Sequence, residues 1–297
     1  MNMIARFLEY LSYERHYSPA TVHAYGHDLE QFVAYLGQDT DSFSLALAKE
    51  DDIRMWMVSL MDQGLSARSV KRKLSSLSSY AKFCLKMGYA DVDITRKVIS
   101  PKADKPLPVF YKESEMNRLR EGEQFADDFL GKRDNLILEM LYQTGMRQAE
   151  MLGLNDNDVD TVSMQVRVFG KRRKERLIPI GNPLKEQIEE YLAYRQEQVG
   201  TTQDHCFFCN AKGQRLNRHT LYNVVHQRMS EVSTLKKQSP HVLRHTFATT
   251  MLNNGADIQT IKTLMGHASL AATQVYTHTT FEQIRKEYNS AHPRSKK

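Results

Sequence analysis

The 297-residue sequence has little of several features that mark large classes of protein. No apolar run approaches the ~20 residues that a transmembrane helix needs. The first residues carry Glu9 inside an amphipathic pattern, which is not typical of a signal peptide. Three cysteines are too few for a disulfide framework. We therefore expect a globular, cytoplasmic protein without a membrane segment.

Metal-binding patterns are also scarce. Cys206 and Cys209 form a CxxC, but no second pair follows at the spacing of a four-ligand zinc site, so we expect a short buried strand there. The acidic residues 155–160 suggest a calcium loop, yet Thr161 stands where such a loop requires glycine and Arg167 where it requires glutamate. We expect that segment to connect a helix to a strand through Asx-type turns. The sequence predicts neither a metal nor another cofactor.

The net charge of +6 is distributed unevenly along the chain. Residues 1–100 hold 12 basic and 12 acidic residues, whereas residues 101–297 hold 29 basic and 23 acidic ones. A basic surface favours a polyanion, because each Lys or Arg at a phosphate releases condensed counterions. Many soluble proteins are mildly basic, however, so charge alone does not decide for nucleic acid.

The first hundred residues are predicted to be helical. Ser18-Pro19 is a helix start, and the following apolar positions keep one face until Gly37. Further helices are expected near 48–62 and 66–87. The last of these carries a basic cluster that is either a solvated face or a face laid along a DNA backbone: Arg68, Lys71, Arg72 and Lys73. Three prolines in residues 100–109 predict a linker, which separates a domain 1–100 from a domain 110–297, with 101–109 between them.

The second domain is predicted to be mixed. Alternating apolar residues near 166–168 and 177–179 flank a basic run, which indicates a strand, a charged turn and a second strand. Helices are expected near 113–121, 126–145, 183–199, 217–230, 240–253 and 257–265, with a short one leading to Tyr276. The fold class is therefore mainly α with a small β-sheet.

A candidate anion site lies at the start of one predicted helix. Ser239-Pro240 begins the helix, and His241 and Arg244 share a face at i and i+3. Free backbone N–H groups, the positive end of the helix dipole and a bidentate guanidinium all favour a phosphate oxygen there. Such a pair is a weak signal in isolation, because a surface His and Arg give the same string.

Other motifs occur around this pair in a fixed order. Residues 144–150 read Thr-Gly-Met-Arg-Gln-Ala-Glu, residues 264–267 read Leu-Met-Gly-His, and residues 274–278 read Gln-Val-Tyr-Thr-His. In order and spacing the whole chain resembles the tyrosine recombinase (phage integrase) family. Residues 291–294, Ala-His-Pro-Arg, resemble its bacterial Xer subgroup. The resemblance implies a helical N-terminal core DNA-binding domain and a mixed α/β catalytic domain that close round duplex DNA as a C-shaped clamp.

The resemblance also implies a role for each matching residue. Arg147 and Arg244 would bind the scissile phosphate. Glu150, three residues after Arg147 and on the same helical face, would orient its neighbours. His241 would assist proton transfer, His267 would hydrogen-bond the phosphate, and Tyr276 would attack it to leave a 3′-phosphotyrosyl link. Lys171 would be the general acid, with Lys174 as an alternative. The remaining basic residues of that turn, Arg172 and Arg173, are candidate DNA contacts together with Lys174 and the basic cluster of the first domain.

Chemistry supports these assignments independently of the family. Arginine stays charged and pairs bidentately, so two of them can stabilise a phosphoryl transition state. Metal-dependent cleavage would need clustered carboxylates, and Asp257 is the one acidic residue between 241 and 278. Tyrosine is a workable nucleophile when a base or cations ease its deprotonation.

The resemblance implies an assembly and leaves the cellular task open. Four identical or paralogous protomers would assemble on two double-stranded DNA sites, each passing a C-terminal helix around residues 281–288 to a neighbour unless that helix packs on its own protomer. A DNA translocase is a candidate activator. We expect site-specific recombination of the Xer type, as in chromosome dimer resolution. The alternatives are an integrase or invertase of a mobile element, a type IB topoisomerase and a DNA-binding relative without catalysis.

Overall fold

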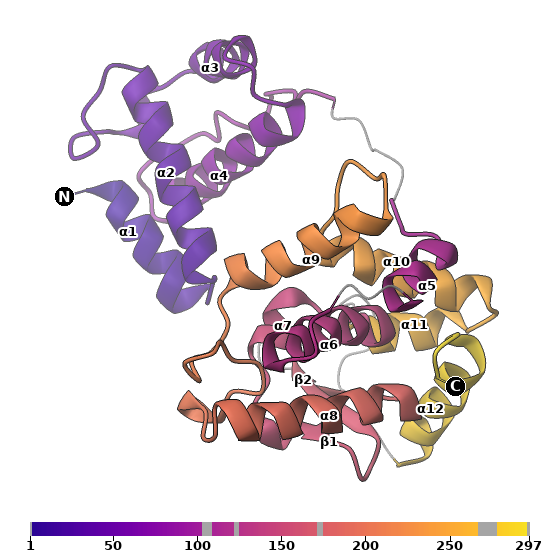
Figure 1. Cartoon of the computed structure of the whole chain (residues 1–297). Coiled ribbons are helices and arrows are strands. Elements are labelled where there is room, and N and C mark those ends of the chain that lie inside the picture. The colour runs from indigo at the N-terminus through magenta and orange to yellow at the C-terminus, as the bar shows by residue number, and fades with distance from the viewer. Residues whose placement is uncertain (1, 103–108, 122–124, 171–174, 267–277, 296–297) are drawn as a thin grey trace. The chain divides into compact units, whose positions relative to one another are not determined.

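The computed structural model describes residues 2–102, 109–121, 125–170, 175–266 and 278–295. The chain divides into two compact units, Met1–Pro106 and Leu107–Lys297 (Figure 1). This division falls within the proline-containing stretch 101–109. Each unit has a hydrophobic core of its own.

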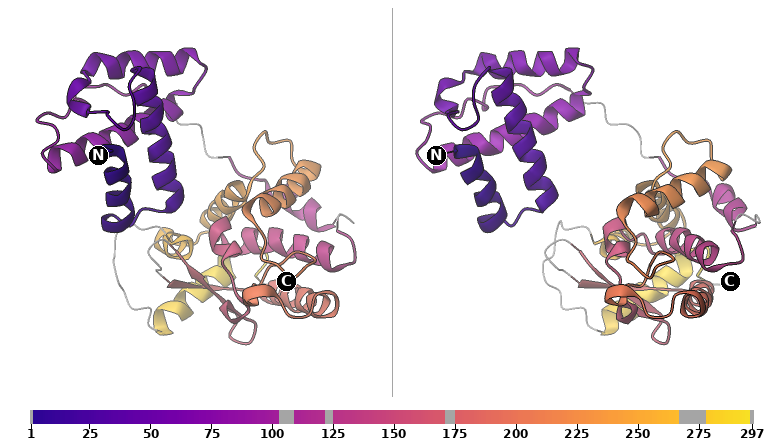
Figure 2. Two further views of the ribbon diagram at one scale, coloured as in Figure 1. Left: turned by 90° about the vertical axis from the view of Figure 1, so that its left-hand side faces the viewer. Right: turned by 60° about the vertical axis from the view of Figure 1, so that its left-hand side comes forward.

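The N-terminal unit is helical. Ser18 accepts a hydrogen bond from the Thr21 backbone N–H, as the sequence predicts, and Ser66 caps the last helix of the unit in the same way. Large aromatic rings fill the interior: Phe32 lies 4.9 Å from Trp56 between ring centroids. Figure 2 shows from two further sides how the helices pack round one another. They are α1 (Met3–Glu9), a π-helical turn (Tyr10–Glu14), α2 (Pro19–Tyr35), a 3₁₀ turn (Leu45–Leu47), α3 (Glu50–Asp62) and α4 (Ala67–Lys86).

The C-terminal unit is mixed, and the predicted fold class is confirmed. Its elements are α5 (Glu113–Glu121), α6 (Phe129–Thr144), α7 (Gln148–Leu152), β1 (Val159–Asp160), β2 (Gln165–Phe169), β3 (Glu175–Pro179), α8 (Asn182–Gln198), α9 (Arg218–Val232), α10 (Pro240–Asn253), α11 (Ile258–Met265) and α12 (His278–Ala291). Hydrophobic periodicity did not indicate the five-residue helix α7, because it is too short to show a periodic pattern, and only the shared helical face of Arg147 and Glu150 pointed to it. The short helix expected just before Tyr276 lies outside the described residues.

Strands β1, β2 and β3 form an antiparallel sheet in that order. Val166 pairs with Ile178 and Val168 with Arg176, so the two predicted strands are confirmed, while the charged turn predicted between them lies outside the described residues. The acidic segment does connect α7 to the sheet, and the Asp160 carboxylate accepts hydrogen bonds from the Val162 and Ser163 N–H groups. It also supplies β1, which the sequence did not indicate.

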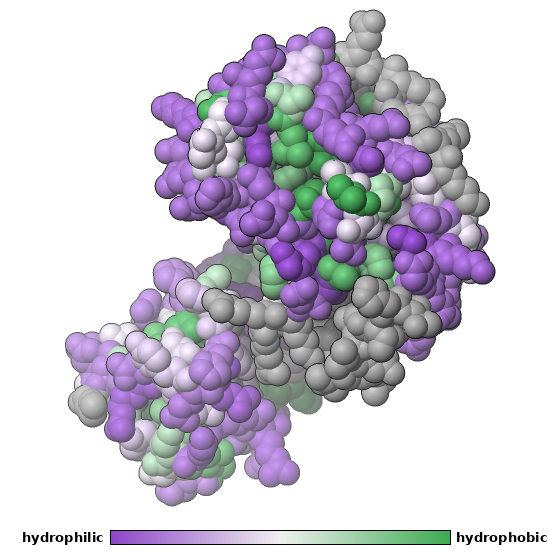
Figure 3. Space-filling view, turned by 90° about the horizontal axis from the view of Figure 1, so that it is seen from below, coloured by the Kyte–Doolittle hydropathy of each residue, from purple (hydrophilic) through white to green (hydrophobic). Residues whose placement is uncertain are grey.

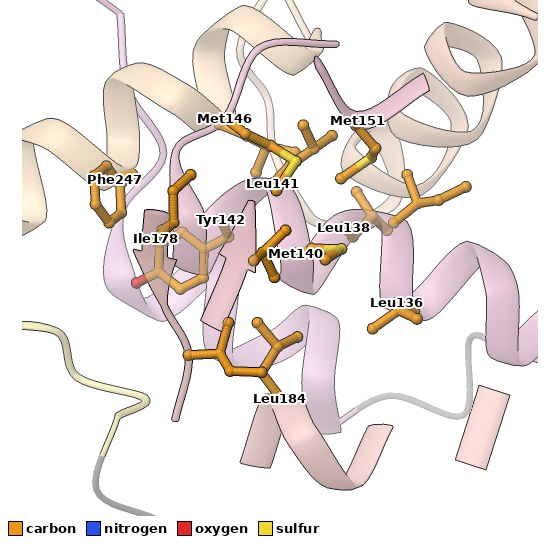
Figure 4. Packing of buried hydrophobic residues seen from close by; sticks show 14 of the residues in the cluster. Leu136, Leu138, Met140, Leu141, Tyr142, Met146, Met151, Ile178, Leu184 and Phe247 are labelled. Carbon is orange, nitrogen blue, oxygen red and sulfur yellow. The ribbon is translucent and has the colours of Figure 1, made fainter. Parts of the chain in front are cut away.

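Helix α6 lies at the centre of the C-terminal unit. Figure 4 shows its Met140 and Tyr142 among side chains from β3, α8 and α10, including Ile178, Leu184 and Phe247. Every residue from 136 to 144 is buried. A rigid central helix fixes the position of the backbone that follows it, at Gly145 and Arg147.

The two cysteines of the CxxC are buried free thiols. Each makes a single β-bridge, Cys206 with Asn155 and Cys209 with Arg215, so the expected short strand is reduced to isolated pairings. Burial raises the pKa of the Cys209 thiol. The described residues contain no group of three His, Cys, Asp or Glu side chains that could hold a metal ion.

Hydrophilic side chains cover most of the described surface seen in Figure 3. Among the described residues, no helix is both long enough and apolar enough to cross a membrane.

Candidate active site

Arg147 is placed by the junction between α6 and α7. Gly145 ends α6 in a left-handed conformation with φ of +60°. Arg147 is then the N-cap of α7: its backbone N–H donates to Glu150 Oε2 at 2.7 Å, and its Nη1 donates to Oε1 at 2.8 Å. The sequence predicted that Arg147 and Glu150 share a face, and this capping interaction is the local reason for their spacing.

Arg244 projects from the second turn of α10 and is 7% exposed. Its Nη1 donates to the Gly145 carbonyl and its Nη2 to the Met265 carbonyl, both at 2.5 Å. Burial, followed by the charge of Arg147, lowers the pKa of Arg244 to about 10. The guanidinium therefore remains charged at neutral pH, in a pocket where that charge is poorly solvated.

A third arginine, which sequence reasoning missed, completes the cluster. Arg176 of β3 is 5% exposed, and its Nη1 and Nη2 each donate to a Glu150 carboxylate oxygen at 2.9 Å. Its Nε donates to the Leu264 carbonyl at 2.7 Å, while Arg147 Nη2 donates to the Gly266 carbonyl at 3.1 Å. Its position two residues after the basic turn gave no signal, because its partners are 26 and 88 residues away in the sequence.

The end of α11 thus binds three guanidinium groups through three successive carbonyls, those of Leu264, Met265 and Gly266. The last carbonyls of a helix lack intrahelical partners and carry the negative end of its dipole. Cations therefore favour that position. The cluster brings together residues from α7, β3 and α10 around the helix end that precedes His267.

Glu150 is the one carboxylate that contacts this cluster among the described residues. Burial acts to raise its pKa, but hydrogen bonds and charge from Arg176, with those from Arg147, outweigh burial and lower it to about 2. Glu150 is therefore ionised at neutral pH. Three guanidinium groups and one carboxylate leave an excess of two positive charges, which suits a phosphodiester anion.

His241 lies in the first turn of α10, and although the residue is exposed to solvent, surrounding protein encloses part of its imidazole. This partial burial lowers its pKa below the usual value, and the nearby side chains of Lys237, His245, Arg218 and Arg244 lower it further. The imidazole is therefore favoured as the neutral form, which can accept a proton.

Several predicted site residues lie outside the described residues: Lys171, Arg172, Arg173, Lys174, His267 and Tyr276. Strand β2 ends at Phe169 and β3 begins at Glu175, on either side of the basic run 171–174. Helix α11 ends at Met265, two residues before His267.

The predicted basic cluster of α4 divides into two kinds of residue. Arg68 and Lys71 are exposed. Arg72 and Lys73 both pair with buried Asp28, at 2.5 and 3.0 Å, and Lys73 is only 6% exposed. Lys73 therefore serves an internal ion pair, and we withdraw it from the expected DNA contacts because an enclosed ammonium group cannot reach a phosphate.

Two protein-family models match the chain, one in each unit. Residues 111–283 match the model described as "Phage integrase family", and residues 4–88 match "Phage integrase, N-terminal SAM-like domain". The chain belongs to the phage integrase family. The resemblance to tyrosine recombinases is thereby confirmed, and the protein is an enzyme of this class, which cleaves and rejoins DNA at specific sites.

Similar proteins cover nearly the whole chain. A tyrosine recombinase XerC from Oceanobacillus iheyensis is 37% identical over 98% of this chain and 96% of its own. A tyrosine recombinase XerD from Staphylococcus haemolyticus is 35% identical over 99% of each chain. Among solved structures, XerH recombinase bound to its difH substrate gives a TM-score of 0.70 at 21% identity, covering 96% of this chain and 84% of that one. At that identity the likeness supports the fold.

Proposed function

We propose that this chain is a Xer-type recombinase whose Tyr276 forms a transient covalent bond with a DNA backbone phosphate. The observation that carries the proposal is the cluster of Arg147, Arg176 and Arg244 on the end of α11, with its excess of two positive charges. A binding module needs basic residues on its surface. Guanidinium groups organised in the interior at the cost of desolvation are typical of a site that stabilises a transition state.

In the cleavage reaction that we propose, each side chain acts on a particular atom of the DNA. Arg147 and Arg244 bind the non-bridging oxygens of the phosphate, and the Tyr276 oxygen attacks phosphorus as the bond to the 5′ oxygen breaks. The tyrosine proton passes to neutral His241, directly or through water. Lys171 or Lys174 protonates the departing 5′ oxygen, and His267 donates a hydrogen bond to the phosphate. The phosphotyrosyl bond conserves the bond energy, so rejoining by a 5′ hydroxyl needs no ATP.

Helix α9 offers a second feature that fits DNA. One exposed face carries side chains able to bond base edges or phosphates: Arg218, His219, Tyr222, Asn223, His226 and Gln227. The start of this helix is joined to the active-site helix α7, because Gln148 Nε2 donates to the Arg218 carbonyl at 2.8 Å. Base contacts there would fix the register of the cleaved phosphate.

The names of the similar XerC and XerD proteins support a chromosomal Xer role over a mobile-element one. In the assembly we propose, four protomers hold two sites, with a DNA translocase as activator. Helix exchange is part of this proposal. In the single chain, Ile284 and Tyr288 of α12 are buried against their own catalytic unit, so an exchanged helix must exchange that partner for a neighbour's equivalent surface.

Covalent trapping tests the proposal. Genomic fragments that the protein retains identify the site, which is then prepared as a duplex with a nick beside the cleaved phosphate so that the short product diffuses away. Wild type should give a protein–DNA adduct stable in denaturant. Tyr276→Phe should give none, and Tyr13→Phe, which changes an exposed tyrosine of the N-terminal unit, should retain it. An adduct that persists in Tyr276→Phe overturns the assignment.

A further inference from the structure

Arg176 is the most enclosed guanidinium of the active-site cluster, and the mechanism above assigns it no step. Its strand, β3, begins at Glu175, directly after the basic run in the sequence that contains Lys171 and Lys174. Its side chain reaches Glu150 of α7 through two hydrogen bonds and the end of α11 through a third. One side chain therefore links the three segments that carry or adjoin Arg147, the candidate general acids and His267.

The shared carboxylate shows how Arg176 influences Arg147. Glu150 accepts two hydrogen bonds from Arg147 and two from Arg176. Without Arg176, the buried carboxylate would be neutralised by Arg147 alone. It would then compete with the DNA phosphate for that guanidinium, and the cluster's excess charge would fall from two to one.

Gly266 shows that the structure accommodates this arginine closely. A Cβ at Gly266 would lie 2.9 Å from Arg176 Nη1, and the residue has a φ of +62°. Any side chain there would displace the guanidinium as well as strain the backbone. The Gly266 carbonyl in turn accepts from Arg147, so Arg176 supports Arg147 from two directions: through Glu150 and through the end of α11.

We propose that Arg176 is a positioning residue for strand cleavage: it neutralises Glu150 and fixes the end of α11, which holds Arg147 toward the scissile phosphate. This inference rests on the proposed function. Because Arg176 acts through Glu150 and the end of α11 and not by contacting DNA, its loss should lower the cleavage rate more than the affinity for DNA.

The decisive variants are Arg176→Gln and Arg176→Lys. Lysine keeps the charge but lacks the planar fork that joins a carboxylate and a carbonyl at once, so it should recover activity only in part. We expect the adduct-forming rate at saturating DNA to fall about 100-fold or more in Arg176→Gln, the scale seen when one transition-state donor is lost. The DNA dissociation constant should stay within about threefold, because the phosphate contacts that dominate affinity are elsewhere.

A neutral substrate separates this role from general structural damage. Replacing one non-bridging oxygen of the scissile phosphate by methyl removes the charge that Arg147 and Arg244 stabilise. If Arg176 acts through them, the penalty of Arg176→Gln should shrink to within about tenfold on this methylphosphonate, since less charge is left to stabilise. An arginine required only for folding would lower cleavage of both substrates by the same factor.

Arg167→Gln is the matched control. Arg167 lies on the neighbouring strand β2 and also binds a carboxylate, Asp158, at 3.3 Å, but among the described residues its hydrogen bonds go to Asp158 and the Asn157 carbonyl and not to the cluster. It should cleave both substrates at the wild-type rate. Circular dichroism identifies the folded variants, and Arg176→Lys carries the test if Arg176→Gln does not fold.

The outcomes are distinct. A large rate loss on the phosphate that shrinks on the methylphosphonate supports the proposal. Wild-type cleavage by folded Arg176→Gln, or an equal loss on both substrates in both variants, overturns it while leaving the proposed function intact. A wild-type protein that forms no Tyr276 adduct overturns the proposed function, and this inference with it.

Discussion

The guanidinium of Arg294 pairs with the Glu139 carboxylate in the interior of the catalytic unit. The two side chains are 6% and 2% exposed, and Arg294 Nη2 also donates to the Met116 carbonyl at 2.6 Å. Arg294 lies near the C-terminus, whereas Glu139 lies on the central helix α6. The pair therefore fixes the segment after α12 to the helix that leads to Arg147.

Removing one partner of this pair should be strongly destabilising. Arg294→Met leaves a charged carboxylate buried and should cost about 3–5 kcal/mol of unfolding free energy. Adding Glu139→Gln removes that charge and should recover part of the loss. Urea unfolding followed by circular dichroism measures both. Arg285→Met breaks an exposed pair with Glu282 on α12 and should cost under about 1 kcal/mol. Equal losses in Arg294→Met and Arg285→Met would contradict the prediction.

His292 should make stability depend on pH. It is 2% exposed and is surrounded by the rings of Tyr142, Phe247 and Tyr288, and burial lowers its pKa from 6.5 to about 4. The unfolded chain therefore binds a proton between pH 6.5 and 4 that the folded chain does not. Stability contributed by His292 is present above pH 6.5 and is lost as pH falls toward 4, by on the order of 3 kcal/mol.

His292→Phe keeps a ring in that position but removes the titration. Its unfolding free energy should fall less between pH 6.5 and 4.5 than that of wild type, even if it is lower at pH 7. His23→Gln, which replaces an exposed histidine, should retain the wild-type slope. The same slope in His292→Phe and wild type would exclude His292 as the origin of the acid sensitivity.

Local signals in the sequence were sufficient for most of the fold. Ser18-Pro19 and Gly37 bound one helix, and the alternation around Val166 defines a strand, because caps and periodicity act over a few residues. The spacing of Arg147 and Glu150 likewise predicted their proximity. The reciprocal capping that joins them follows from the same three-residue separation.

Long-range pairing could not be predicted in the same way. Lys73 looks like part of a basic helix face until Asp28, 45 residues earlier, is seen to accept a hydrogen bond from its ammonium group. Arg176 looks like one more cation after a basic turn until Glu150 is seen beside it. In both cases the partner is set by tertiary packing, which a periodic pattern does not encode.

Lys71 and Lys73 should therefore respond differently to substitution. If the exposed face of α4 contacts DNA, Lys71→Ala should reduce the salt dependence of binding by about one phosphate contact and leave stability unchanged. Lys73→Met should instead destabilise the N-terminal unit by about 1–3 kcal/mol, because Asp28 loses a buried partner. Trp56, the single tryptophan of the chain, is buried in that unit and reports its unfolding by fluorescence. A changed salt slope in Lys73→Met without destabilisation would restore Lys73 as a DNA contact.

A substrate with a different leaving group distinguishes between Lys171 and Lys174 as the general acid. Replacing the departing 5′ oxygen by sulfur makes a leaving thiolate, whose conjugate acid has a pKa of about 8.5, so it needs no proton. If Lys171 is the acid, Lys171→Met should slow cleavage of ordinary DNA by about 10²–10⁴-fold and cleave the sulfur-substituted strand at nearly the wild-type rate. Lys174→Met should then affect neither substrate. The reverse pattern assigns Lys174, and a loss that sulfur does not restore in either variant shows that neither lysine protonates the leaving group.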